Sequence, residues 1–445
     1  MESIALHNLG CKVNGYEMDV MQQILQEKGY KIVPFDEKAD VYIINTCTVT
    51  NIADQKSRQM LHRAKKKNPD AVVVAVGCYV QTGEEKIAED AAIDLVIGNN
   101  RKKDVVEILE KYLAAKESGT LQDKDKTLQS QTVIDINHTQ EYEEMQLTGT
   151  GGHTRAYVKI QDGCNQFCSY CIIPYARGRV RSRREEDILA EVSGLVKTGY
   201  QEIVLTGIHI SSYGVDRGGP ELLQLLEKLN AVEGLRRIRL GSLEPGIITE
   251  EFAEKLSALS KVCPHFHLSL QSGCDETLRR MNRRYTTGEY LEKVEILRRY
   301  FERPAITTDV IVGFPGETEE EFASTEAFLE KVHFYEMHIF KYSKRQGTRA
   351  AVMENQVADQ VKTERSGRLM ALERRMSQEY RQSFVGEKVE VLYEEAKKIG
   401  EIVYQIGHTV RYIKVGRKAQ GDFKNCILAE TITKVLQDDI MLVEE

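Results

Sequence analysis

The stretch Gly163-Cys164-Asn165-Gln166-Phe167-Cys168-Ser169-Tyr170-Cys171 places three cysteines on one short loop with the spacing CxxxCxxC. No fourth cysteine follows this loop triad (Cys164, Cys168 and Cys171), because the next residues are Ile172, Ile173 and Pro174. A structural zinc site closes with four ligands, and a ferredoxin-type run supplies four thiolates at a different spacing. Three thiolates fit three corners of a cubane iron–sulfur cluster, whose fourth iron is open to bind a substrate. The alternative, three buried small apolar side chains, needs chance to group three of nine cysteines.

The sequence around this loop alternates strands and helices. Strands are expected at Ala156–Ile160, Ile203–Thr206, Arg236–Leu240, Phe266–Leu270, Ala305–Val312 and Glu336–Phe340. Capping boxes, in which Ser or Thr is followed three residues later by Glu, mark helix starts at Ser182…Glu185, Thr286…Glu289 and Thr318…Glu321. These units predict a partial (β/α)6 barrel over residues 151–380, with ligands at the C-terminal ends of its strands. A helix near Gln356–Gln382 ends this domain.

Residues 1–113 also alternate strands and helices, which indicates an α/β domain with a parallel sheet. Strands are expected at Ser3–Leu9, Val41–Asn45, Ala71–Val76 and Leu95–Ile97, with helices near Tyr16–Lys28 and Lys56–Lys67. A strand-end triad, Cys11, Cys47 and Cys78, follows the ends of three of these strands. Ligands of open parallel sheets bind beyond the carboxyl ends of the strands, so these thiols should converge on one spot. Buried core cysteines are the alternative, but three equivalent strand ends favour a second ligand set.

Two further segments complete the chain. Residues 114–150 are rich in Gln, Thr, Asp and Glu and are interpreted as a linker, partly strand-like at Thr132–Ile136. Residues 381–445 are β-rich, with strands expected at Lys388–Tyr393, Ile402–Ile406, Thr409–Val415 and Ile427–Val435. A segment of this size and pattern predicts a small closed antiparallel β-barrel of the OB-like kind. The remaining Cys263, Cys274 and Cys426 share no ligand spacing and are interpreted as free thiols.

Composition limits the class of protein. The chain of 445 residues is 41% hydrophobic and 29% charged, which is ordinary for a globular protein of several domains. Its apolar runs are too short to span a bilayer, and its N-terminus lacks the pattern of a signal peptide. Cysteines clustered for metal ligation indicate a reducing cytoplasm. The net charge of −7 gives no global electrostatic case for nucleic acid, so any such case depends on local patches.

The loop motif, with the aromatic Tyr170 before its last cysteine, resembles that of the radical S-adenosylmethionine enzymes. The whole arrangement is similar to the methylthiotransferases of that superfamily, which join an N-terminal domain with an auxiliary cluster, a radical barrel and a C-terminal TRAM domain. The motifs that carry the resemblance are Leu9-Gly10-Cys11-Lys12-Val13-Asn14, Asn45-Thr46-Cys47-Thr48-Val49-Thr50-Asn51, Gly77-Cys78-Tyr79 and Cys171-Ile172-Ile173-Pro174-Tyr175-Ala176-Arg177-Gly178. They resemble the branch that acts on N6-threonylcarbamoyladenosine in tRNA. The branch acting on isopentenyladenosine typically has Gln-Met-Asn after its first cysteine.

The resemblance implies two 4Fe–4S clusters and S-adenosylmethionine as cofactors. The loop triad would hold the cluster that cleaves S-adenosylmethionine, and the resulting 5′-deoxyadenosyl radical would take a hydrogen from carbon 2 of the adenine. The strand-end triad would hold an auxiliary cluster that presents sulfur, and a second S-adenosylmethionine would supply the methyl group. Cys47 is therefore counted with the loop triad as catalytic. A flavodoxin or ferredoxin would donate electrons to a cytoplasmic monomer that contacts no membrane.

The S-adenosylmethionine site is expected along the C-terminal ends of the barrel strands. The candidates are Gly207, Ser242, Glu244, Gln271, Asp309 and Gly313. Glycine at a strand end lets backbone groups approach a ligand, and polar side chains bind its polar groups. For each side chain, an ordinary role in a turn or helix cap remains the alternative. His209 and His267 are interpreted as hydrogen-bonded structural residues, because radical abstraction needs no general base.

RNA contacts are expected from local basic runs. The first run comprises Arg177, Arg179, Arg181, Arg183 and Arg184 beside the cluster loop, and a second comprises Arg279, Arg280, Arg283 and Arg284. In the tail, Arg411 and Lys414 would belong to one basic face. Such side chains would bind phosphates of a tRNA anticodon loop, and Tyr175 would stack on a splayed-out base. A solvated protein surface is the alternative for any charged run.

The sequence therefore predicts a tRNA methylthiotransferase. One alternative is the same chemistry on isopentenyladenosine in tRNA or on a ribosomal-protein aspartate. The other alternative belongs to a different class, a non-catalytic iron–sulfur protein that binds RNA or senses redox state.

Overall fold

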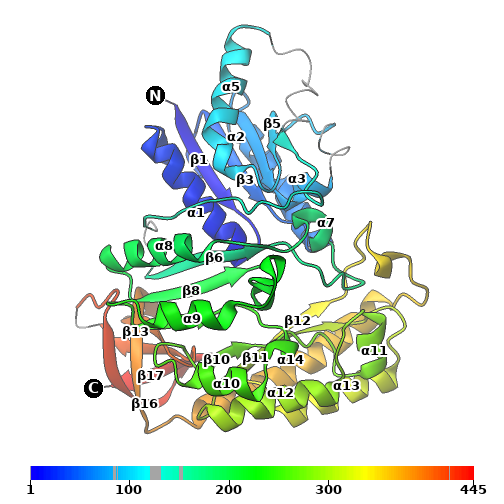
Figure 1. Ribbon diagram of the computed structural model, residues 1–445, viewed down its shortest axis with the longest axis vertical. Coiled ribbons are helices and arrows are strands. Elements are labelled where there is room, and N and C mark those ends of the chain that lie inside the picture. Colours follow the sequence, from blue (N-terminus) through cyan, green and yellow to red (C-terminus); the bar gives the residue numbers. More distant parts are fainter. Residues whose placement is uncertain are drawn as a thin grey trace.

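The computed structural model describes residues 2–83, 87, 89–120, 132–149, 154–419 and 421–444. Figure 1 shows the N-terminal α/β part at the top in blue and cyan, and the central part below it in green and yellow. The C-terminal strands lie at the lower left in orange and red, so the two ends of the chain are far apart. The central part therefore connects to both of the others, and the candidate cysteines lie on the side of it that faces the N-terminal part.

The N-terminal part is a parallel sheet with helices packed on both faces. Its strands are β1 (Ser3–Asn8), β2 (Lys31–Val33), β3 (Val41–Thr46), β4 (Val72–Gly77) and β5 (Leu95–Ile97), in the order β2-β1-β3-β4-β5. The helices are α1 (Lys12–Glu27), α2 (Asn51–Lys67), α3 (Cys78–Thr82) and α5 (Val105–Glu117), with a 3-10 turn at Lys102–Asp104. Every residue of β3 and β4 is buried, as expected of parallel strands that are covered on both sides. The expected parallel sheet is confirmed, and β2 escaped the sequence analysis because it is only three residues long.

The central part is the expected partial barrel of β/α units. One sheet contains β6 (Arg155–Asp162), β7 (Arg181–Ser182), β8 (Glu202–Gly207) and β9 (Arg237–Leu240), and a second contains β10 (His265–His267), β11 (Ala305–Val312) and β12 (Glu336–Lys341). Isolated bridges, such as Leu243 to Leu268, join the two sheets into one curved wall. Its helices are α7 (Ile173–Arg177), α8 (Glu185–Lys197), α9 (Leu222–Asn230), α10 (Glu250–Ser257), α11 (Asp275–Arg280), α12 (Thr287–Tyr300), α13 (Glu319–Val332) and α14 (Asp359–Gln382), and its 3-10 turns lie at Ile210–Ser212, Val215–Arg217, Pro245–Ile247 and Arg349–Val352. Each helix in the described residues is too short or too polar to cross a lipid bilayer.

Two of the three capping boxes expected from the sequence are present. The capping boxes at Thr286…Glu289 and Thr318…Glu321 are both present, and they begin α12 and α13. The box expected at Ser182…Glu185 is wrong, because Arg184 is the residue that precedes α8. The Ser182 hydroxyl donates instead to Asp216, 34 residues away in the sequence. The Ser182 hydroxyl thus bonds to a distant carboxylate and does not cap the helix that the local pattern predicts.

The connection between the two α/β parts packs against both of them. Residues 121–131 and 150 of the expected linker lie outside the described residues. The strand expected at Thr132–Ile136 is wrong, since this stretch is not extended in a sheet, and Val133 and Ile136 within it are buried. Further along, Met145 is buried, and its carbonyl accepts a hydrogen bond of 2.6 Å from the Tyr16 hydroxyl of α1. This segment therefore holds the two parts together instead of spacing them apart.

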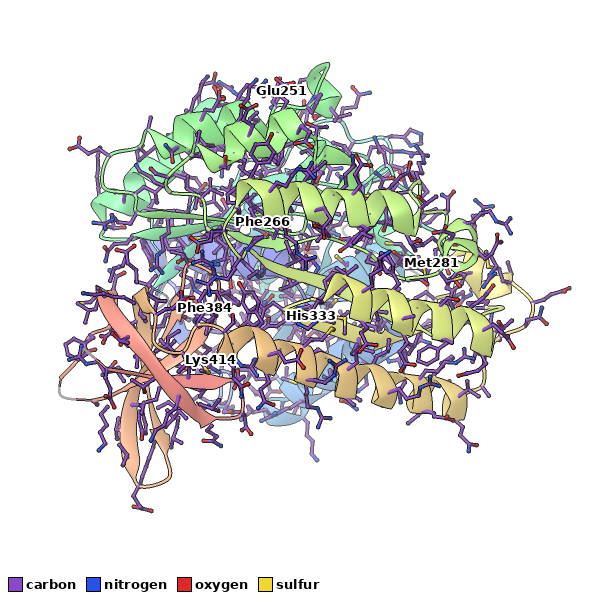
Figure 2. The ribbon with its side chains drawn as sticks, turned by 90° about the horizontal axis from the view of Figure 1, so that it is seen from below. Glu251, Phe266, Met281, His333, Phe384 and Lys414 are labelled. Carbon is purple, nitrogen blue, oxygen red and sulfur yellow. The ribbon has the colours of Figure 1, made fainter. Side chains whose placement is uncertain are left out.

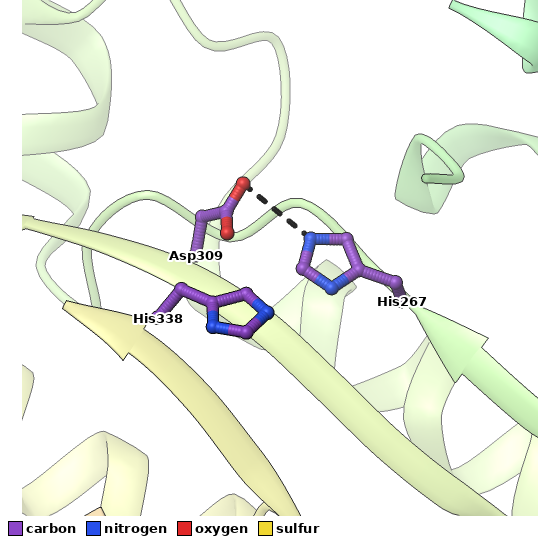
Figure 3. A group of neighbouring side chains, drawn as sticks. All are labelled: His267, Asp309 and His338. Atoms are coloured by element: carbon purple, nitrogen blue, oxygen red, sulfur yellow. Dashed lines mark ion pairs between the residues drawn. The ribbon is translucent and has the colours of Figure 1, made fainter. Parts of the chain in front are cut away.

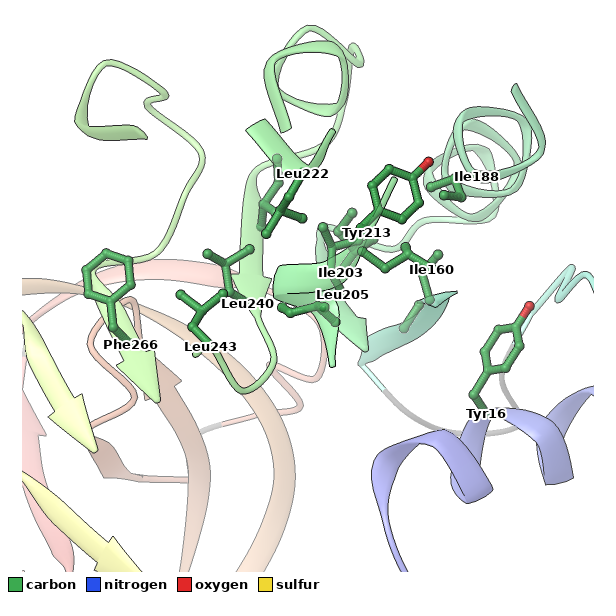
Figure 4. Close-up of a cluster of buried hydrophobic side chains, with 14 of the residues drawn as sticks. Tyr16, Ile160, Ile188, Ile203, Leu205, Tyr213, Leu222, Leu240, Leu243 and Phe266 are labelled. Carbon is green, nitrogen blue, oxygen red and sulfur yellow. The ribbon is translucent and has the colours of Figure 1, made fainter. Parts of the chain in front are cut away.

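One hydrophobic core continues from α1 into the central barrel (Figure 4). Tyr16 of α1 is completely buried and belongs to the same cluster as Ile160 of β6 and Ile188 of α8. Figure 4 shows Tyr16 beside the strand that carries Ile160. Shared burial of this kind fixes two parts relative to each other, so a site formed between them is in place before any ligand binds.

The C-terminal strands form a closed barrel, as expected. They are β13 (Lys388–Ile399), β14 (Ile402–Thr409), β15 (Lys414–Lys418), β16 (Ile427–Gln437) and β17 (Ile440–Glu444), in the order β13-β14-β15-β17-β16. The strand expected at Thr409–Val415 begins only at Lys414, because the preceding residues form a turn in which Tyr412 has a positive φ of 65°. Figure 2 shows Lys414 on this barrel and Phe384 nearby, just beyond the end of α14. Its identity as a TRAM domain stays a prediction.

The turn between β14 and β15 docks this barrel at the N-terminal ends of the central strands. The Tyr412 ring lies 5.1 Å from the Arg155 guanidinium and 4.8 Å from that of Arg239, and it stacks on His265 at 5.0 Å. Arg239 also donates to the carbonyl of Thr409 at 3.3 Å. The small barrel therefore closes the end of the central barrel opposite to the cysteine loop.

Candidate functional site

The loop triad lies directly after β6, on a loop whose shape depends on one glycine. Gly163 has a positive φ of 73°, and a Cβ at this position would lie 1.8 Å from the Arg179 carbonyl oxygen. Only glycine fits there, because the loop backbone passes this close to the segment that leaves it. The Cys164 amide donates to the Gly178 carbonyl at 3.0 Å, and the Cys171 amide donates to the Cys168 carbonyl at 2.9 Å. These contacts hold the three thiols on one compact, half-buried loop.

The strand-end triad comes together as expected, because it follows neighbouring strands. Cys11 precedes α1 after β1, Cys47 follows β3, and Cys78 is the first residue of α3 after β4. These three strands are adjacent in the sheet. A Cβ at Gly10 (φ 106°) would lie 2.9 Å from the Cys47 Cβ, so the loops after β1 and β3 touch. Three thiols from distant parts of the chain thus meet at one edge of the sheet.

Burial disfavours the ionised form of several of these thiols. Burial raises the pKa of Cys47 and of Cys164 to about 11, and it raises the pKa of Cys171 to about 12. A thiolate is the form that binds a metal, and a bound metal ion supplies the missing positive charge. Two sets of three sulfur ligands, each without a fourth, fit two 4Fe–4S clusters that each leave one iron open.

Buried donors point at the sulfur atoms of both sets. The Arg283 Nη1 lies 3.3 Å from the Cys168 Sγ in the loop triad. The Arg177 Nε lies 3.3 Å, and the Asn99 Nδ2 3.5 Å, from the Cys78 Sγ in the strand-end triad. Hydrogen bonds and positive charge beside cluster sulfurs tune the reduction potential of such sites. Both donors of positive charge come from the central part, so it contributes to each set.

A cavity of about 330 Å³ adjoins the loop triad and reaches the segment that follows Cys47 of the strand-end triad. It is lined by all three loop-triad cysteines and, from the N-terminal part, by Val49 and Thr50, which follow Cys47. Three of the expected S-adenosylmethionine residues, Glu244, Gln271 and Asp309, line its floor at the barrel strand ends. Its other walls, which the sequence analysis did not single out, include Ile311, Phe340, Tyr342 and Ser343. This cavity is the candidate active site.

Glu244 is held firmly within this cavity. Arg283 Nη2 donates to its two carboxylate oxygens at 2.7 and 2.8 Å, and the His209 Nε2 lies 3.6 Å away. Burial alone would raise the pKa of Glu244, but His209 and the charge of Arg283 lower it. Arg283, assigned to an RNA-binding run by the sequence analysis, thus belongs to the cavity. Its position depends on a turn after α11 that the sequence pattern does not reveal.

The remaining three candidates lie away from the cavity lining. A Cβ at Gly313 would lie 2.2 Å from the Lys362 Cγ, so this glycine allows α14 to pack closely. The Gly313 amide donates to Glu317 at 2.6 Å. Ser242 is exposed, and Gly207 packs against the Gln161 carbonyl. Their roles in cofactor binding stay predictions.

The basic run after the cluster loop is not the phosphate-binding surface that the sequence analysis expected. Arg177, Arg181 and Arg183 are only 0%, 1% and 1% exposed, so this interpretation is wrong for them. Arg177 pairs with Glu17 and Asp162, Arg183 pairs with Glu191, and Arg181 donates to backbone carbonyls. Arg179 and Arg184 are exposed, and the Arg179 guanidinium lies 4.5 Å from the centre of the Phe167 ring.

The basic residues of the tail are likewise occupied. Arg411 donates to the carbonyls of Glu302 and Arg303 at 2.7 and 3.0 Å, so it fastens the small barrel to the central part. Lys414 lies 3.5 Å from Asp439 on the same barrel. These contacts do not test RNA binding, so the expected roles of Arg411 and Lys414 stay predictions.

A second, outer cleft of about 790 Å³ lies beside the cavity. Arg58 and Tyr79 line it from the N-terminal part, and Tyr175 and Lys344 line it from the central part. Arg58, Lys344 and Tyr175 are exposed. Ile172 borders both the cleft and the inner cavity, so the two spaces adjoin at the cysteine loop. The cleft combines basic and aromatic side chains, which are the groups that bind phosphates and stack on bases.

Comparisons with known proteins agree with this organisation. Residues 158–329 match the Radical SAM superfamily, and residues 3–98 match the Uncharacterized protein family UPF0004. The threonylcarbamoyladenosine tRNA methylthiotransferase MtaB of Bacillus subtilis (strain 168) is 42% identical over 436 residues, which cover 98% of this chain and 94% of that one. MtaB of Aquifex aeolicus (strain VF5) is 39% identical and covers 89% of this chain and 94% of its own length. The tRNA-2-methylthio-N(6)-dimethylallyladenosine synthase of Moorella thermoacetica is also 39% identical, over 87% of this chain and 86% of its own.

A solved structure shares the fold. The radical S-adenosylmethionine methyltransferase TsrM from Kitasatospora setae, with cobalamin and a 4Fe–4S cluster bound, superposes with a TM-score of 0.55. The match covers 79% of this chain and 77% of that chain at 15% identity, which is evidence for the fold alone.

Proposed function

Since this chain belongs to the radical S-adenosylmethionine methylthiotransferases, we propose that it adds a methylthio group to carbon 2 of N6-threonylcarbamoyladenosine in tRNA, next to the anticodon. Relatives named for this substrate match almost the whole chain. The reaction replaces a carbon–hydrogen bond by a carbon–sulfur bond and then methylates the sulfur. It requires two 4Fe–4S clusters and S-adenosylmethionine.

The observation that carries this function is one cavity bordered by the loop triad and by the chain segment after Cys47 of the strand-end triad. The loop triad lines the cavity, and Val49 and Thr50, next to Cys47, line it from the opposite side. A reaction that joins a carbon radical to a sulfur atom needs the two centres close together, because a free radical would react elsewhere. An RNA-binding or redox-sensing protein without catalysis has no need for this arrangement.

The chain's own residues bind, orient and shield the reactants. When bound, the loop cluster supplies the electron that cleaves S-adenosylmethionine, and the strand-end cluster supplies the sulfur. We assign Glu244 to the ammonium group of S-adenosylmethionine and Gln271 to its other polar atoms. Arg283 and His209 fix the Glu244 carboxylate before the ligand arrives, which lowers the cost of binding. Ile311, Phe340 and Tyr342 exclude water from the reacting atoms.

The outer cleft would receive the anticodon loop. Arg58 and Lys344 would bind phosphates on its two walls, and Tyr175 would stack on a base. A flipped-out adenosine would then enter the inner cavity past Ile172, because chemistry on a base requires it to leave the stack. These residues replace the buried arginines as candidates for RNA binding.

Further parts of the proposal rest on the family and on the sequence pattern. The domains are residues 1–113, 151–380 and 381–445, the last a TRAM domain. A flavodoxin or ferredoxin donates electrons, and the enzyme works as a monomer in the cytoplasm.

The test is nucleoside analysis after reaction in vitro. The purified, iron-loaded enzyme is incubated anaerobically with a reductant, S-adenosylmethionine and anticodon stem-loops that carry either threonylcarbamoyladenosine or isopentenyladenosine. We expect the 2-methylthio product from the first RNA and 5′-deoxyadenosine in the same mixture. Product from the isopentenyl RNA alone would assign the chain to the other tRNA branch. A lack of 5′-deoxyadenosine under all conditions would leave only the non-catalytic alternative.

A further inference from the structure

Three side chains from neighbouring strands gather at the floor of the inner cavity (Figure 3). His267 comes from β10, Asp309 from β11 and His338 from β12, and one polar atom of each lies within 4.8 Å of the others. The His267 Nε2 is 3.4 Å from an Asp309 carboxylate oxygen, and the two imidazole rings stack at 5.8 Å. Asp309 also lines the cavity that contains the loop triad. Through Asp309, the group thus borders the space where the substrate must lie.

The members of this group differ in how fully their hydrogen bonds are satisfied. His267 has a partner on each ring nitrogen, since its Nδ1 is 3.0 Å from the Thr307 hydroxyl and its Nε2 faces Asp309. His338 is exposed, and its imidazole makes no hydrogen bond with any residue that the structure describes. His338 therefore has a free donor for a ligand, while His267 and Asp309 form a fixed pair behind it.

Lys12 brings an uncommitted positive charge to the same place. It follows Cys11 directly, and its charge acts on both Asp309 and His338. Its side chain is accessible to solvent, at the start of α1 on the N-terminal part. In the described part of the chain, Lys12 forms neither an ion pair nor a hydrogen bond through its ammonium group.

The other cations around the cavity are already engaged. Arg283 is bound to Glu244, Arg345 is bound to Asp54, and Lys341 donates to the Thr363 hydroxyl. A cation without a counter-ion in the protein is free to pair with an anionic group of a ligand. An anionic ligand group beside Lys12 and His338 would satisfy both of them.

The substrate of the proposed function carries such a group. Its N6 arm is a threonine joined through a carbamoyl unit, and it ends in a carboxylate, whereas an isopentenyl arm is uncharged and apolar. We propose that Lys12 and His338 bind the carboxylate of this arm, and that the Asp309–His267 pair holds His338 in position. These residues then select an adenosine that carries an amino acid, an inference that depends on the proposed function.

Electrostatics gives the arm one orientation. Asp309 repels a second carboxylate, so the arm's carboxylate lies on the Lys12 and His338 side, and its hydroxyl is free to donate toward Asp309. Charge-assisted hydrogen bonds of this kind are roughly twice as strong as neutral ones. A site built to bind a polar group rejects an analogue without it, because its own polar groups are then left unpaired.

The experiment compares two anticodon stem-loops that differ in charge at the arm. One carries threonylcarbamoyladenosine, and the other carries the same nucleoside with its carboxylate converted to a carboxamide. The native enzyme should methylthiolate the carboxylate RNA with a kcat/KM about 10- to 100-fold higher. Lys12→Met and His338→Phe should each lose most of this preference, chiefly by slowing the reaction of the carboxylate RNA. Lys12→Arg, which keeps the charge, should keep the preference.

Controls separate recognition from damage to the clusters. Lys341→Met removes another lysine from the cavity wall and should keep the preference for the carboxylate. Iron content and 5′-deoxyadenosine formation are measured for each variant. If Lys12→Met loses iron, the preference of His338→Phe for the carboxylate RNA becomes the test of the inference. If the native enzyme acts equally on both RNAs, or if the two variants retain the preference, the inference is wrong. Failure to act on the carboxylate RNA at all would instead refute the proposed function.

The same three side chains also have the composition of a divalent-cation site. Metal analysis of the native enzyme, after reconstitution with iron and exposure to zinc, distinguishes the two cases. We expect no zinc that depends on His338. About one zinc per chain, lost in the His338→Phe variant, would overturn the assignment to a carboxylate.

Discussion

Arg177 is the residue that ties the strand-end triad to the central part. Its Nε contacts the Cys78 Sγ at 3.3 Å, and its Nη1 lies 2.8 Å from Glu17 and 3.0 Å from Asp162. Lys159 is bound to the same two carboxylates at 2.7 and 2.6 Å. All of these side chains are buried, so none of their charges is compensated by water. The group joins α1, β6 and α7 at the boundary of the N-terminal and central parts.

Replacing Arg177 with Met should therefore destabilise the protein. Removal of one partner from a buried ionic network leaves uncompensated carboxylates, which costs roughly 3–5 kcal/mol. Chemical denaturation of the protein without its clusters should show this loss, and the melting temperature of the loaded enzyme should fall. Arg184→Gln, in the same run but with a side chain that is 71% exposed, should change the stability by less than about 0.5 kcal/mol. If Arg177→Met has unchanged stability but binds tRNA more weakly, Arg177 contacts RNA phosphates, as the sequence pattern predicts.

The sequence alone does not distinguish these arginines, because buried and exposed residues lie close together in the run. Arg181 is buried and Arg179 is exposed, and the carboxylates that pair with the buried ones lie elsewhere in the chain. Glu17, for example, is 160 residues from Arg177. A charge run predicts a solvated or phosphate-binding surface only when nothing folds over it. Here α1 and the segment that contains Met145 cover it, and neither contact leaves a local signal.

At the scale of elements, the prediction of the cysteine loop succeeded because its determinants are local. The spacing of the loop triad and the glycine before it lie within nine residues, and capping boxes span four. The strand-end triad was predictable for another reason, since parallel β/α units place successive strand ends at one edge of the sheet. The errors fall where a distant group intervenes, as at Ser182, or where an element is very short, as at β2 and β7.

Substitution of Gly163 by Ala should disrupt the loop triad specifically. The added Cβ would lie 1.8 Å from the Arg179 carbonyl oxygen, so the loop must move and Cys164 must leave its position. The reconstituted enzyme should then bind about four iron atoms in place of about eight, since each cubane contains four. It should form no 5′-deoxyadenosine. Gly194→Ala, within α8 and with nothing within 4 Å of the new Cβ, should keep all the iron and both products. Full iron content in Gly163→Ala would show that the loop tolerates the shift.

At the scale of the whole molecule, the outer cleft decides where RNA binds. The protein has a net charge of −7, so attraction to tRNA must come from a local arrangement of exposed cations. Arg58 and Lys344 stand on opposite walls of the cleft, one from each part of the chain. The sequence could not reveal this pairing, because the two residues approach each other only through the fold.

Replacing Arg58 and Lys344 together with Gln should weaken tRNA binding and reduce its dependence on salt. Each lost phosphate contact should lower the slope of log affinity against log salt concentration by about 0.7–0.9. Affinity measured between 50 and 300 mM salt checks this expectation. Arg279→Gln, whose side chain is 74% exposed and outside the cleft, serves as the matched control and should leave the slope unchanged. An altered slope in the control alone would indicate that RNA binds at the surface beside α11 and not in the outer cleft.

The two cysteine sites have separate chemical roles, and these roles depend on the arrangement of the whole molecule. The loop triad lies in the central barrel, and the strand-end triad lies in a sheet with its own buried strands, so each can be removed without unfolding the other. The triple variant Cys11→Ala, Cys47→Ala, Cys78→Ala should therefore still form 5′-deoxyadenosine from S-adenosylmethionine, because the radical arises at the loop. It should form no methylthiolated nucleoside, because no sulfur is presented to the radical. Cys171→Ala should lose both products, and both are measured in one anaerobic reaction mixture. Methylthiolation by the triple variant would mean that sulfur reaches the substrate by a route that does not pass through the N-terminal sheet.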